Sequence, residues 1–242
     1  MNTPHPLVMV TGASSGIGAA TALAFAEHGY PLLMVARRAE PMEKLGLANA
    51  VCRSVDITDD GAVKAAIDEA EALYGSVDLL VNNAGLMPLG QIHEQDPAQW
   101  QELFEVNCLA LLRASQFVLP GMMARKRGTI LNVSSIAGRY TFNNHTAYCG
   151  TKYAVHAITE SMRKEYAPHG IRLGVIAPGI VDTNLLSSTG DQSIVDSYVA
   201  HRDNIGGGLS AQVVAEAIRS MYELPQDVNM REIVIAPTMQ LS

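Results

Sequence analysis

The chain has few cysteines and few aromatic side chains. Only 5% of its 242 residues are aromatic, and its three cysteines, Cys52, Cys108 and Cys149, are scattered along the sequence. An odd number of cysteines without metal-like spacing is typical of neither a disulfide framework nor a metal site. The chain also lacks the charged start, apolar run and cleavage site of a secretory signal. We therefore expect a reduced, cytoplasmic protein without a bound metal.

Positive charge is scarce as well. Lys and Arg together number 17 against 24 Asp and Glu, so the formal net charge is −7, and no basic tract stands out. Nucleic acid is therefore not an expected partner. No apolar stretch approaches the roughly 18 residues that a membrane helix needs, so a membrane partner is not expected either.

Strands and helices alternate along the chain without a repeat or a low-complexity linker. A chain of 242 residues with 48% apolar content suits one α/β domain, over residues 1–242, with a large core. The alternation predicts one parallel sheet of about seven strands with helices on both faces. Strands are expected at 7–11, 32–36, 50–55, 79–82, 129–133, 172–176 and 232–236. Helices are expected at 19–28, 59–74, 97–123, 146–167 and 210–223.

A glycine-rich turn follows the first apolar run. Gly12, Gly16 and Gly18 lie between the predicted strand 7–11 and a segment of helical composition. Glycines on such a turn let backbone N–H groups and a helix N-terminus approach a phosphate without interference from a Cβ. The spacing Gly-x-x-x-Gly-x-Gly is one residue longer than the usual dinucleotide fingerprint, so a plain tight turn is the alternative. The order of strand, turn and helix favours a pyrophosphate-binding site.

The end of the second predicted strand indicates which dinucleotide is bound. About 20 residues past the first glycine, an acidic residue would bind the ribose 2′-hydroxyl of NAD. This chain instead has Ala36 followed by Arg37 and Arg38. A guanidinium suits a 2′-phosphate, and no carboxylate repels it. Two solvated arginines at the start of a helix are the alternative, but that reading leaves the missing carboxylate unexplained, so the sequence favours NADP(H).

Tyr148 and Lys152 are four residues apart in a segment of helical composition. On a helix this spacing places a phenol and an ammonium on one face, where the cation favours the phenolate. A tyrosine whose pKa is lowered from about 10 acts as a general acid or base near neutral pH. Taken alone, the pair is more typical of a surface tyrosine beside a solvated lysine. Next to a cofactor-binding turn, it predicts proton transfer.

Together these motifs resemble the short-chain dehydrogenase/reductase family over nearly the whole chain. The glycine motif spans 11–18, Asp56 follows the third strand, and further family motifs occur at 82–85 and 178–183. The resemblance implies a doubly wound, Rossmann-like sheet and an NADP(H)-dependent oxidoreductase. It implies as cofactor-binding residues Gly12, Ser14, Ser15, Gly16, Ile17, Gly18, Arg37, Arg38, Asp56, Ile57, Asn83, Ala84, Gly85, Tyr148, Lys152, Pro178, Gly179, Ile180 and Thr183.

The resemblance also implies four catalytic residues, Asn107, Ser135, Tyr148 and Lys152. Tyr148 gives a proton to the carbonyl oxygen in reduction and removes it in oxidation, while Ser135 hydrogen-bonds that oxygen as negative charge develops. Lys152 stabilises the phenolate and binds the nicotinamide ribose. Asn107, a poor helix former inside a predicted helix, is expected to face the site through a water, with a solvated helix face as the alternative. The serine-to-tyrosine spacing of the family selects Ser135 over Ser134.

Residues 184–208 show no clear periodicity and end in three glycines. We expect a long polar loop that closes over the substrate as a lid, with an ordinary flexible excursion as the alternative.

The C-terminal stretch 223–240 resembles the branch of the family that uses NADP with 3-hydroxy acids, serine-like amino acids and small carbonyl compounds. The pocket is expected to have apolar walls, Leu86, Met87, Leu185 and Leu186, and three candidate cations for a carboxylate, Arg139, His145 and His201. Taken individually, each of the three cations is more typical of a solvated loop residue. We expect a small alcohol or carbonyl substrate, with a 3-hydroxy acid as the leading case and a neutral ketone or aldehyde as the alternative.

Two other functions share parts of this pattern. A non-catalytic NADP(H)-sensing regulator would keep the glycine turn and Arg37 but could lose the four catalytic residues, which are all present here. A nucleotide-sugar epimerase or dehydratase needs a larger C-terminal region than the roughly sixty residues that follow 178–179. By the same family resemblance, the long helices at 97–123 and 146–167 are expected to pack against another copy in a homodimer or homotetramer.

Overall fold

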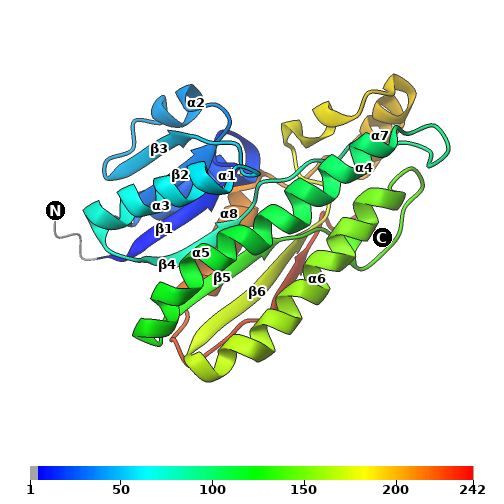
Figure 1. The fold of residues 1–242 in the computed structure, drawn as a ribbon. Helices are drawn as coiled ribbons and strands as arrows, with labels where there is room; N and C mark the ends of the chain where they lie inside the picture. Colours follow the sequence, from blue (N-terminus) through cyan, green and yellow to red (C-terminus); the bar gives the residue numbers. More distant parts are fainter. Residues whose placement is uncertain (1–4, 242) are drawn as a thin grey trace.

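The computed structural model describes residues 5–241. Seven strands form one parallel sheet in the order β3-β2-β1-β4-β5-β6-β7 (Figure 1). The strands are β1 (Leu7–Thr11), β2 (Leu32–Ala36), β3 (Ala50–Ser54), β4 (Val77–Asn82), β5 (Gly128–Val133), β6 (Ile171–Pro178) and β7 (Glu232–Ile235). The predicted seven-stranded parallel sheet is confirmed, and every predicted strand overlaps an observed one.

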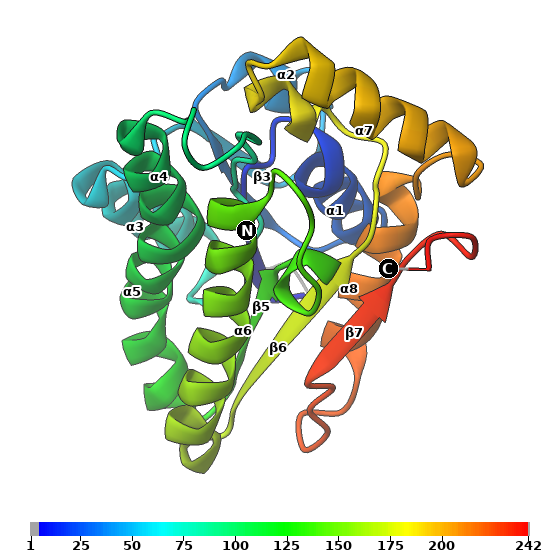
Figure 2. The same cartoon turned by 90° about the vertical axis from the view of Figure 1, so that its right-hand side faces the viewer.

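Helices cover both faces of the sheet (Figure 2). One face carries α1 (Gly16–Glu27) and α8 (Ala211–Glu223), and the other carries α3 (Asp60–Tyr74), α5 (Ala110–Arg125) and α6 (Thr146–Tyr166). Successive side chains of a strand enter opposite cores: Met9 packs with the α3 and α5 side, and Val10 with the α1 and α8 side. Strands buried on both faces are continuous apolar runs, which is why β1 and β2 were visible in the sequence.

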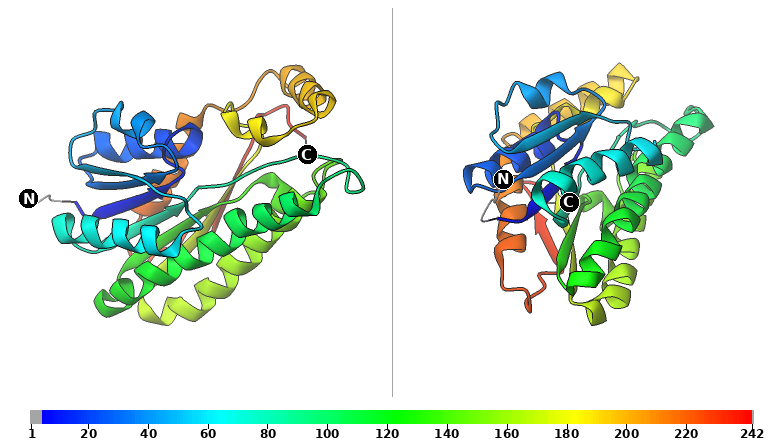
Figure 3. Two further views of the ribbon diagram at one scale, coloured as in Figure 1. Left: turned by 45° about the horizontal axis from the view of Figure 1, so that its top comes forward. Right: turned by 60° about the vertical axis from the view of Figure 1, so that its left-hand side comes forward.

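The strand order reverses between β1 and β4, because β1 is followed by β2 on one side of the sheet and β4 lies on the other. In doubly wound sheets a crevice opens at this point, outside the carboxyl ends of the strands. α7 (Gln192–Asn204) lies at this end of the molecule, away from the first residues of β1 (Figures 1 and 3).

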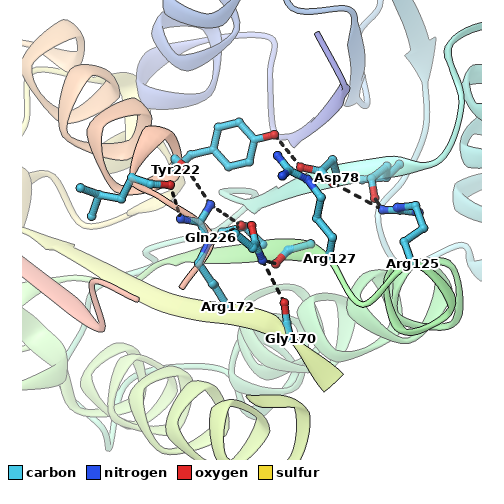
Figure 4. A network of polar contacts seen from close by, with 11 residues as sticks. Asp78, Arg125, Arg127, Gly170, Arg172, Tyr222 and Gln226 are labelled. Atoms are coloured by element: carbon cyan, nitrogen blue, oxygen red, sulfur yellow. Dashed lines mark hydrogen bonds and ion pairs between the residues drawn. The ribbon is translucent and has the colours of Figure 1, made fainter. Parts of the chain in front are cut away.

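The opposite end of the sheet is closed by a buried polar network (Figure 4). The Tyr222 hydroxyl donates to Asp78 Oδ2 at 2.7 Å, and Arg127 Nε donates to Asp78 Oδ1 at 3.2 Å. The Arg172 guanidinium donates to Tyr222 O at 2.7 Å and to Thr129 Oγ1 at 2.8 Å. These bonds tie the first residues of β4, β5 and β6 to the end of α8. The side chains of Asp78, Arg172 and Tyr222 are all hydrogen-bonded here, and the crevice lies at the other end of the sheet.

The longest predicted helix is observed as one continuous run with a π-helical turn in it. α4 (Pro97–Phe104) passes through the π turn Glu105–Leu109 into α5, which ends at Arg125. The expectation that no stretch is long and apolar enough to cross a membrane was wrong, because 97–125 meets both criteria. Half of its apolar window is buried, since α5 packs against β4 and β5 as a core helix of the fold.

Residues 184–208 are not the long loop that we expected. They form a 3₁₀ turn, Asn184–Ser188, and then α7, whose N-cap Asp191 accepts hydrogen bonds from Ser193 N and Ile194 N. None of the residues of α7 is fully buried, so the helix shows little of the apolar periodicity by which a core helix is predicted. The short helix α2 (Glu40–Glu43) was also not predicted.

Candidate active site

The glycine turn packs too closely for side chains. A Cβ on Gly12 would lie 2.9 Å from the Cα of Ala84, and a Cβ on Gly18 would lie 2.4 Å from the carbonyl oxygen of Gly12. Gly12 also has a φ of +65°, which favours glycine. Ser15 is the N-cap of α1, but its side chain makes no capping hydrogen bond. The first N–H groups of α1 are therefore available to an anion.

Hydrogen bonds between the ends of β1 and β4 hold the turn in place. The backbone N–H groups of Asn83 and Ala84 both donate to Thr11 Oγ1 at 3.0 Å. The Asn83 side chain donates to Thr11 O at 2.9 Å and to Gly12 O at 3.3 Å. These bonds join the loop after β1 to the loop after β4, the two loops on either side of the point where the strand order reverses.

A cavity of about 610 Å³ runs along the carboxyl ends of the strands. Three of the predicted site residues, Gly18, Asn107 and Ile180, do not line it, because Gly18 packs under the turn and Ile180 N donates to Gln240 Oε1 at 2.9 Å. The predicted residues that do line it are Gly12, Ser14, Ser15, Gly16, Ile17, Arg37, Arg38, Asp56, Ile57, Asn83, Ala84, Gly85, Ser135, Tyr148, Lys152, Pro178, Gly179 and Thr183.

Two exposed arginines mark one end of the cavity. Arg37 and Arg38 follow the buried Ala36 at the end of β2. Asp56 lies nearby, and its carboxylate accepts from Thr58 N at 2.9 Å and from Thr58 Oγ1 at 2.8 Å. These bonds hold the pKa of Asp56 below its ordinary value. No carboxylate occupies the position of Ala36, so this end is suited to a negatively charged group.

Ser135, Tyr148 and Lys152 line the cavity between β5 and α6. Tyr148 and Lys152 are one turn apart on α6, and they are only 4% and 7% exposed. Lys152 Nζ donates to Val133 O at 3.0 Å and lies 5.6 Å from the centre of the Tyr148 ring. The Ser135 hydroxyl accepts from Ala137 N at 3.1 Å.

Burial determines the protonation states of Tyr148 and Lys152. Burial raises the pKa of the Tyr148 phenol, and a hydrogen bond to Ser135 offsets only part of that rise. Burial also lowers the pKa of Lys152 to about 8. The predicted lowering of the phenol pKa by Lys152 was wrong for this structure, because the ammonium bonds Val133 O over the ring face and desolvation is the larger effect. The phenol is therefore neutral near pH 7 and carries a proton that it can donate.

Asn107 lies in the π turn, not in a regular α-helix. Its Oδ1 accepts from Leu86 N at 2.9 Å, and its Nδ2 donates to Leu86 O at 3.0 Å and to Thr151 Oγ1 at 3.1 Å. The expectation that this side chain faces the cavity is not met, because protein partners take up its amide. Asn107 instead joins the loop after β4 to α6, which carries Tyr148.

The other end of the cavity has the four predicted apolar residues in its wall, but none of the three predicted cations. Arg139 is paired with both carboxylate oxygens of Glu232 on β7. His145 Nδ1 lies 2.6 Å from Asn143 O, and burial lowers the pKa of this imidazole. His201 is exposed on α7 and does not line the cavity. The apolar residues that line it are Leu86, Met87, Leu185 and Leu186.

Sequence reasoning missed Tyr198, which lines the cavity from α7. It belongs to the same apolar cluster as Tyr148 and Leu186, together with Ile194 one turn earlier. The spacing of Ile194 and Tyr198, one helical turn apart, is the signal that could have revealed a helix facing the site.

Comparisons with known proteins agree with this geometry. Residues 6–193 match the family described as short chain dehydrogenase. An uncharacterised oxidoreductase of Staphylococcus saprophyticus is 35% identical, over 99% of this chain and 98% of that protein. The closed form of serine dehydrogenase complexed with NADP⁺ has a TM-score of 0.90 at 26% identity, over 98% of this chain and 96% of that one. An alcohol dehydrogenase from the archaeon Thermococcus sibiricus, complexed with 5-hydroxy-NADP, has a TM-score of 0.84 at 26% identity, over 98% and 99%.

Proposed function

We propose that this chain, which belongs to the short-chain dehydrogenase family, interconverts an alcohol and a carbonyl compound with NADP(H) as the hydride carrier. The observation that carries the proposal is the buried group of Ser135, Tyr148 and Lys152 in a cavity that also contains the glycine turn. A dinucleotide site that leads to a buried proton donor suits hydride transfer coupled to proton transfer.

The cofactor end fits a dinucleotide with a 2′-phosphate. The turn at Gly12 has room for backbone only, so a pyrophosphate can approach the N-terminus of α1. Arg37 and Arg38 would bind the 2′-phosphate, and Asp56 and Ile57 the adenine. The NADP⁺ and 5-hydroxy-NADP complexes of the two structural relatives support NADP(H) over NAD(H).

In the proposed mechanism three side chains act on one oxygen. Bound nicotinamide supplies hydride in reduction and accepts it in oxidation. Tyr148 donates its hydroxyl proton to the substrate oxygen as the carbonyl is reduced, and Ser135 donates a hydrogen bond to that oxygen. Lys152, cationic below its pKa of about 8, then stabilises the phenolate that remains. Asn107 is a positioning residue, because it holds the Leu86 loop against α6.

For the substrate we propose a small neutral carbonyl compound or its alcohol. The apolar wall of Leu86, Met87, Leu185 and Leu186 and the absence of Arg139, His145 and His201 from the lining support this choice. A 3-hydroxy acid is the second candidate, favoured by the likeness to serine dehydrogenase. Comparing kcat/KM for a 3-hydroxy acid and its methyl ester separates them: a site that binds the carboxylate should prefer the acid by about tenfold or more, as one charge-assisted contact implies.

Steady-state oxidation and reduction of a panel of alcohols and carbonyl compounds, with both cofactors, tests the proposal. We expect turnover in both directions and a preference for NADP(H). Tight NADPH binding without turnover of any compound would instead support a non-catalytic NADP(H)-sensing regulator.

We further propose a cytoplasmic homodimer or homotetramer whose chain is a single NADP(H)-binding domain, with 184–208 as its substrate lid. Phe104, Leu109 and Leu112 on the α4 and α5 run and Tyr153 on α6 are large apolar side chains that remain exposed, as a subunit contact requires. Sedimentation equilibrium at micromolar concentration tests the assembly, and a 25.9 kDa species alone would exclude it.

A further inference from the structure

Of the residues of α7, all of which the structure describes, Tyr198 alone lines the cavity. Its ring is stacked on the His145 imidazole, with 6.4 Å between the ring centres and an interplanar angle of 26°. It also packs in one apolar cluster with Tyr148 and Leu186. The same His145 ring lies 6.2 Å, centre to centre, from the ring of Tyr148, so it lies next to both tyrosines. Tyr198 is therefore fixed beside the group that we propose transfers the proton.

The segment that carries Tyr198 is anchored to the loop after β4. Ser188 Oγ accepts from Met87 N at 3.1 Å. Thr189 Oγ1 accepts from Leu89 N at 3.1 Å and donates to Met87 O at 2.9 Å. Because Thr189 is buried, these bonds are protected from water, and they hold α7 over the cavity.

The Tyr198 hydroxyl makes no hydrogen bond to any residue from 5 to 241. A tyrosine with a largely buried ring normally directs its hydroxyl to a partner. Since the ring is held in place and the residue lines the cavity, a molecule bound beside Tyr148 would supply that partner.

The charges near Tyr198 favour an uncharged hydrogen-bond partner for its hydroxyl. Burial raises the pKa of Tyr198, so its hydroxyl is neutral near pH 7 and both donates and accepts. Arg202, one turn further along α7, is paired with Asp203. The lining also includes Glu102, whose negative charge opposes a carboxylate, and Glu105, which is paired with Arg113.

We infer that Tyr198 determines specificity by hydrogen-bonding a second, uncharged oxygen of the substrate, so that the preferred substrate is a hydroxyketone or, in oxidation, the matching diol. The inference rests on the proposed function, because it names the substrate class of the same site. Simple ketones would contact the apolar wall but leave the Tyr198 hydroxyl unpaired. Hydroxy acids would bring a carboxylate next to Tyr198, where the cation one turn away, Arg202, is already paired with Asp203.

The test compares 3-hydroxy-2-butanone with 2-butanone, which differ by one hydroxyl, in wild type and Tyr198→Phe. We expect wild type to prefer the hydroxyketone by about tenfold in kcat/KM, and Tyr198→Phe to remove that preference by lowering kcat/KM for the hydroxyketone about tenfold more than kcat/KM for 2-butanone. The dissociation constant of NADPH should not change. Tyr140→Phe, which removes a hydroxyl from an exposed tyrosine outside the cavity, is the matched control and should behave as wild type.

Equal losses on both ketones, or no preference in wild type, would overturn the role of Tyr198 and leave the proposed function intact. Absence of turnover with every carbonyl compound would contradict the proposed function instead. In that case calorimetric titration of the enzyme–NADP⁺ complex with the same two ketones still decides the inference. Weaker hydroxyketone binding in Tyr198→Phe supports it, and unchanged binding contradicts it.

Discussion

The two ends of the cavity are built in different ways. The cofactor end consists of short loops that directly follow the buried strands β1, β2 and β4, and the bonds from Asn83 to Thr11 and Gly12 lock two of these loops together. The proposed substrate end, with Leu86, Met87, Leu185 and Leu186 in its wall, is also lined by Tyr198 of α7. This helix has no fully buried residue and is anchored through Ser188 and Thr189. The geometry of the proposed cofactor end therefore depends on the sheet, whereas that of the proposed substrate end depends on how α7 packs against the loop after β4. Changes at the two ends should affect different kinetic constants.

Removing the phenolic oxygen at Tyr148 should have the largest effect. Tyr148→Phe keeps the ring but has no proton to give, so kcat should fall about 10³-fold while NADPH still binds. Stopped-flow or steady-state rates, together with NADPH fluorescence, measure both quantities. Tyr140→Phe is again the control. If the variant kept more than a tenth of kcat, another group would be the proton donor.

Lys152→Met, in the same buried group, tests how much the burial of the Lys152 ammonium lowers the free energy of unfolding. Burial lowers the pKa of Lys152 from 10.5 to about 8, so between these values the unfolded chain binds more protons than the folded chain. Stability contributed by this group is therefore lost as pH falls toward 8 and regained as pH rises toward 10.5. Relative to Lys152→Met, the free energy of unfolding of wild type should rise by about 3 kcal/mol over that window. Urea unfolding of both proteins at each pH measures this difference, and a difference that stays constant with pH would contradict the lowered pKa of Lys152.

The cofactor end alone should respond to Arg37→Ala combined with Ala36→Asp. A 2′-phosphate would lose a charge-assisted partner and face a carboxylate, so KM for NADPH should rise about 10- to 100-fold and the gap to NADH should narrow. KM for the carbonyl substrate should change little. Lys44→Ala, which removes an exposed cation paired with Glu40, is the control. An unchanged preference for NADPH over NADH would contradict the proposed role of Arg37 in binding the 2′-phosphate.

The smallest effect is expected at the substrate end. Thr189→Val removes the hydroxyl that bonds Leu89 N and Met87 O, and this loosens the anchor of α7. We expect KM for the carbonyl substrate to rise about fivefold at nearly constant NADPH affinity. Ser197→Ala, on an exposed part of α7, should have no effect. Equal weakening of cofactor and substrate would mean that the two ends are not independent.

Sequence reasoning located the cofactor end because its residues are adjacent to apolar runs. The run 32–36 is buried on both faces, so its end, and with it the position of Arg37, could be predicted within a residue or two. The glycine turn was visible because the absence of a Cβ is itself recorded in the sequence. The place of Tyr148 and Lys152 on one face of α6 followed from helical spacing.

The same reasoning failed where contacts between distant segments decide the outcome. The ion pair of Arg139 with Glu232 joins residues 93 positions apart, and it removes a cation that was expected at the pocket. Asn107 bonds Leu86 and Thr151 across three segments, and this pairing explains why it does not face the cavity. The pKa of Tyr148 depends on burial, which four residues of sequence do not reveal.

Local patterns in the sequence were enough to predict the seven strands, the backbone cradle at Gly12 to Gly18 and the Tyr148–Lys152 pair, because each depends on local periodicity or on a missing side chain. Only the tertiary structure decided which charges are paired, how strongly Tyr148 is desolvated and which residue of α7 lines the cavity. These properties depend on segments that lie far apart in the chain and pack together only in the fold, and no local pattern records that packing.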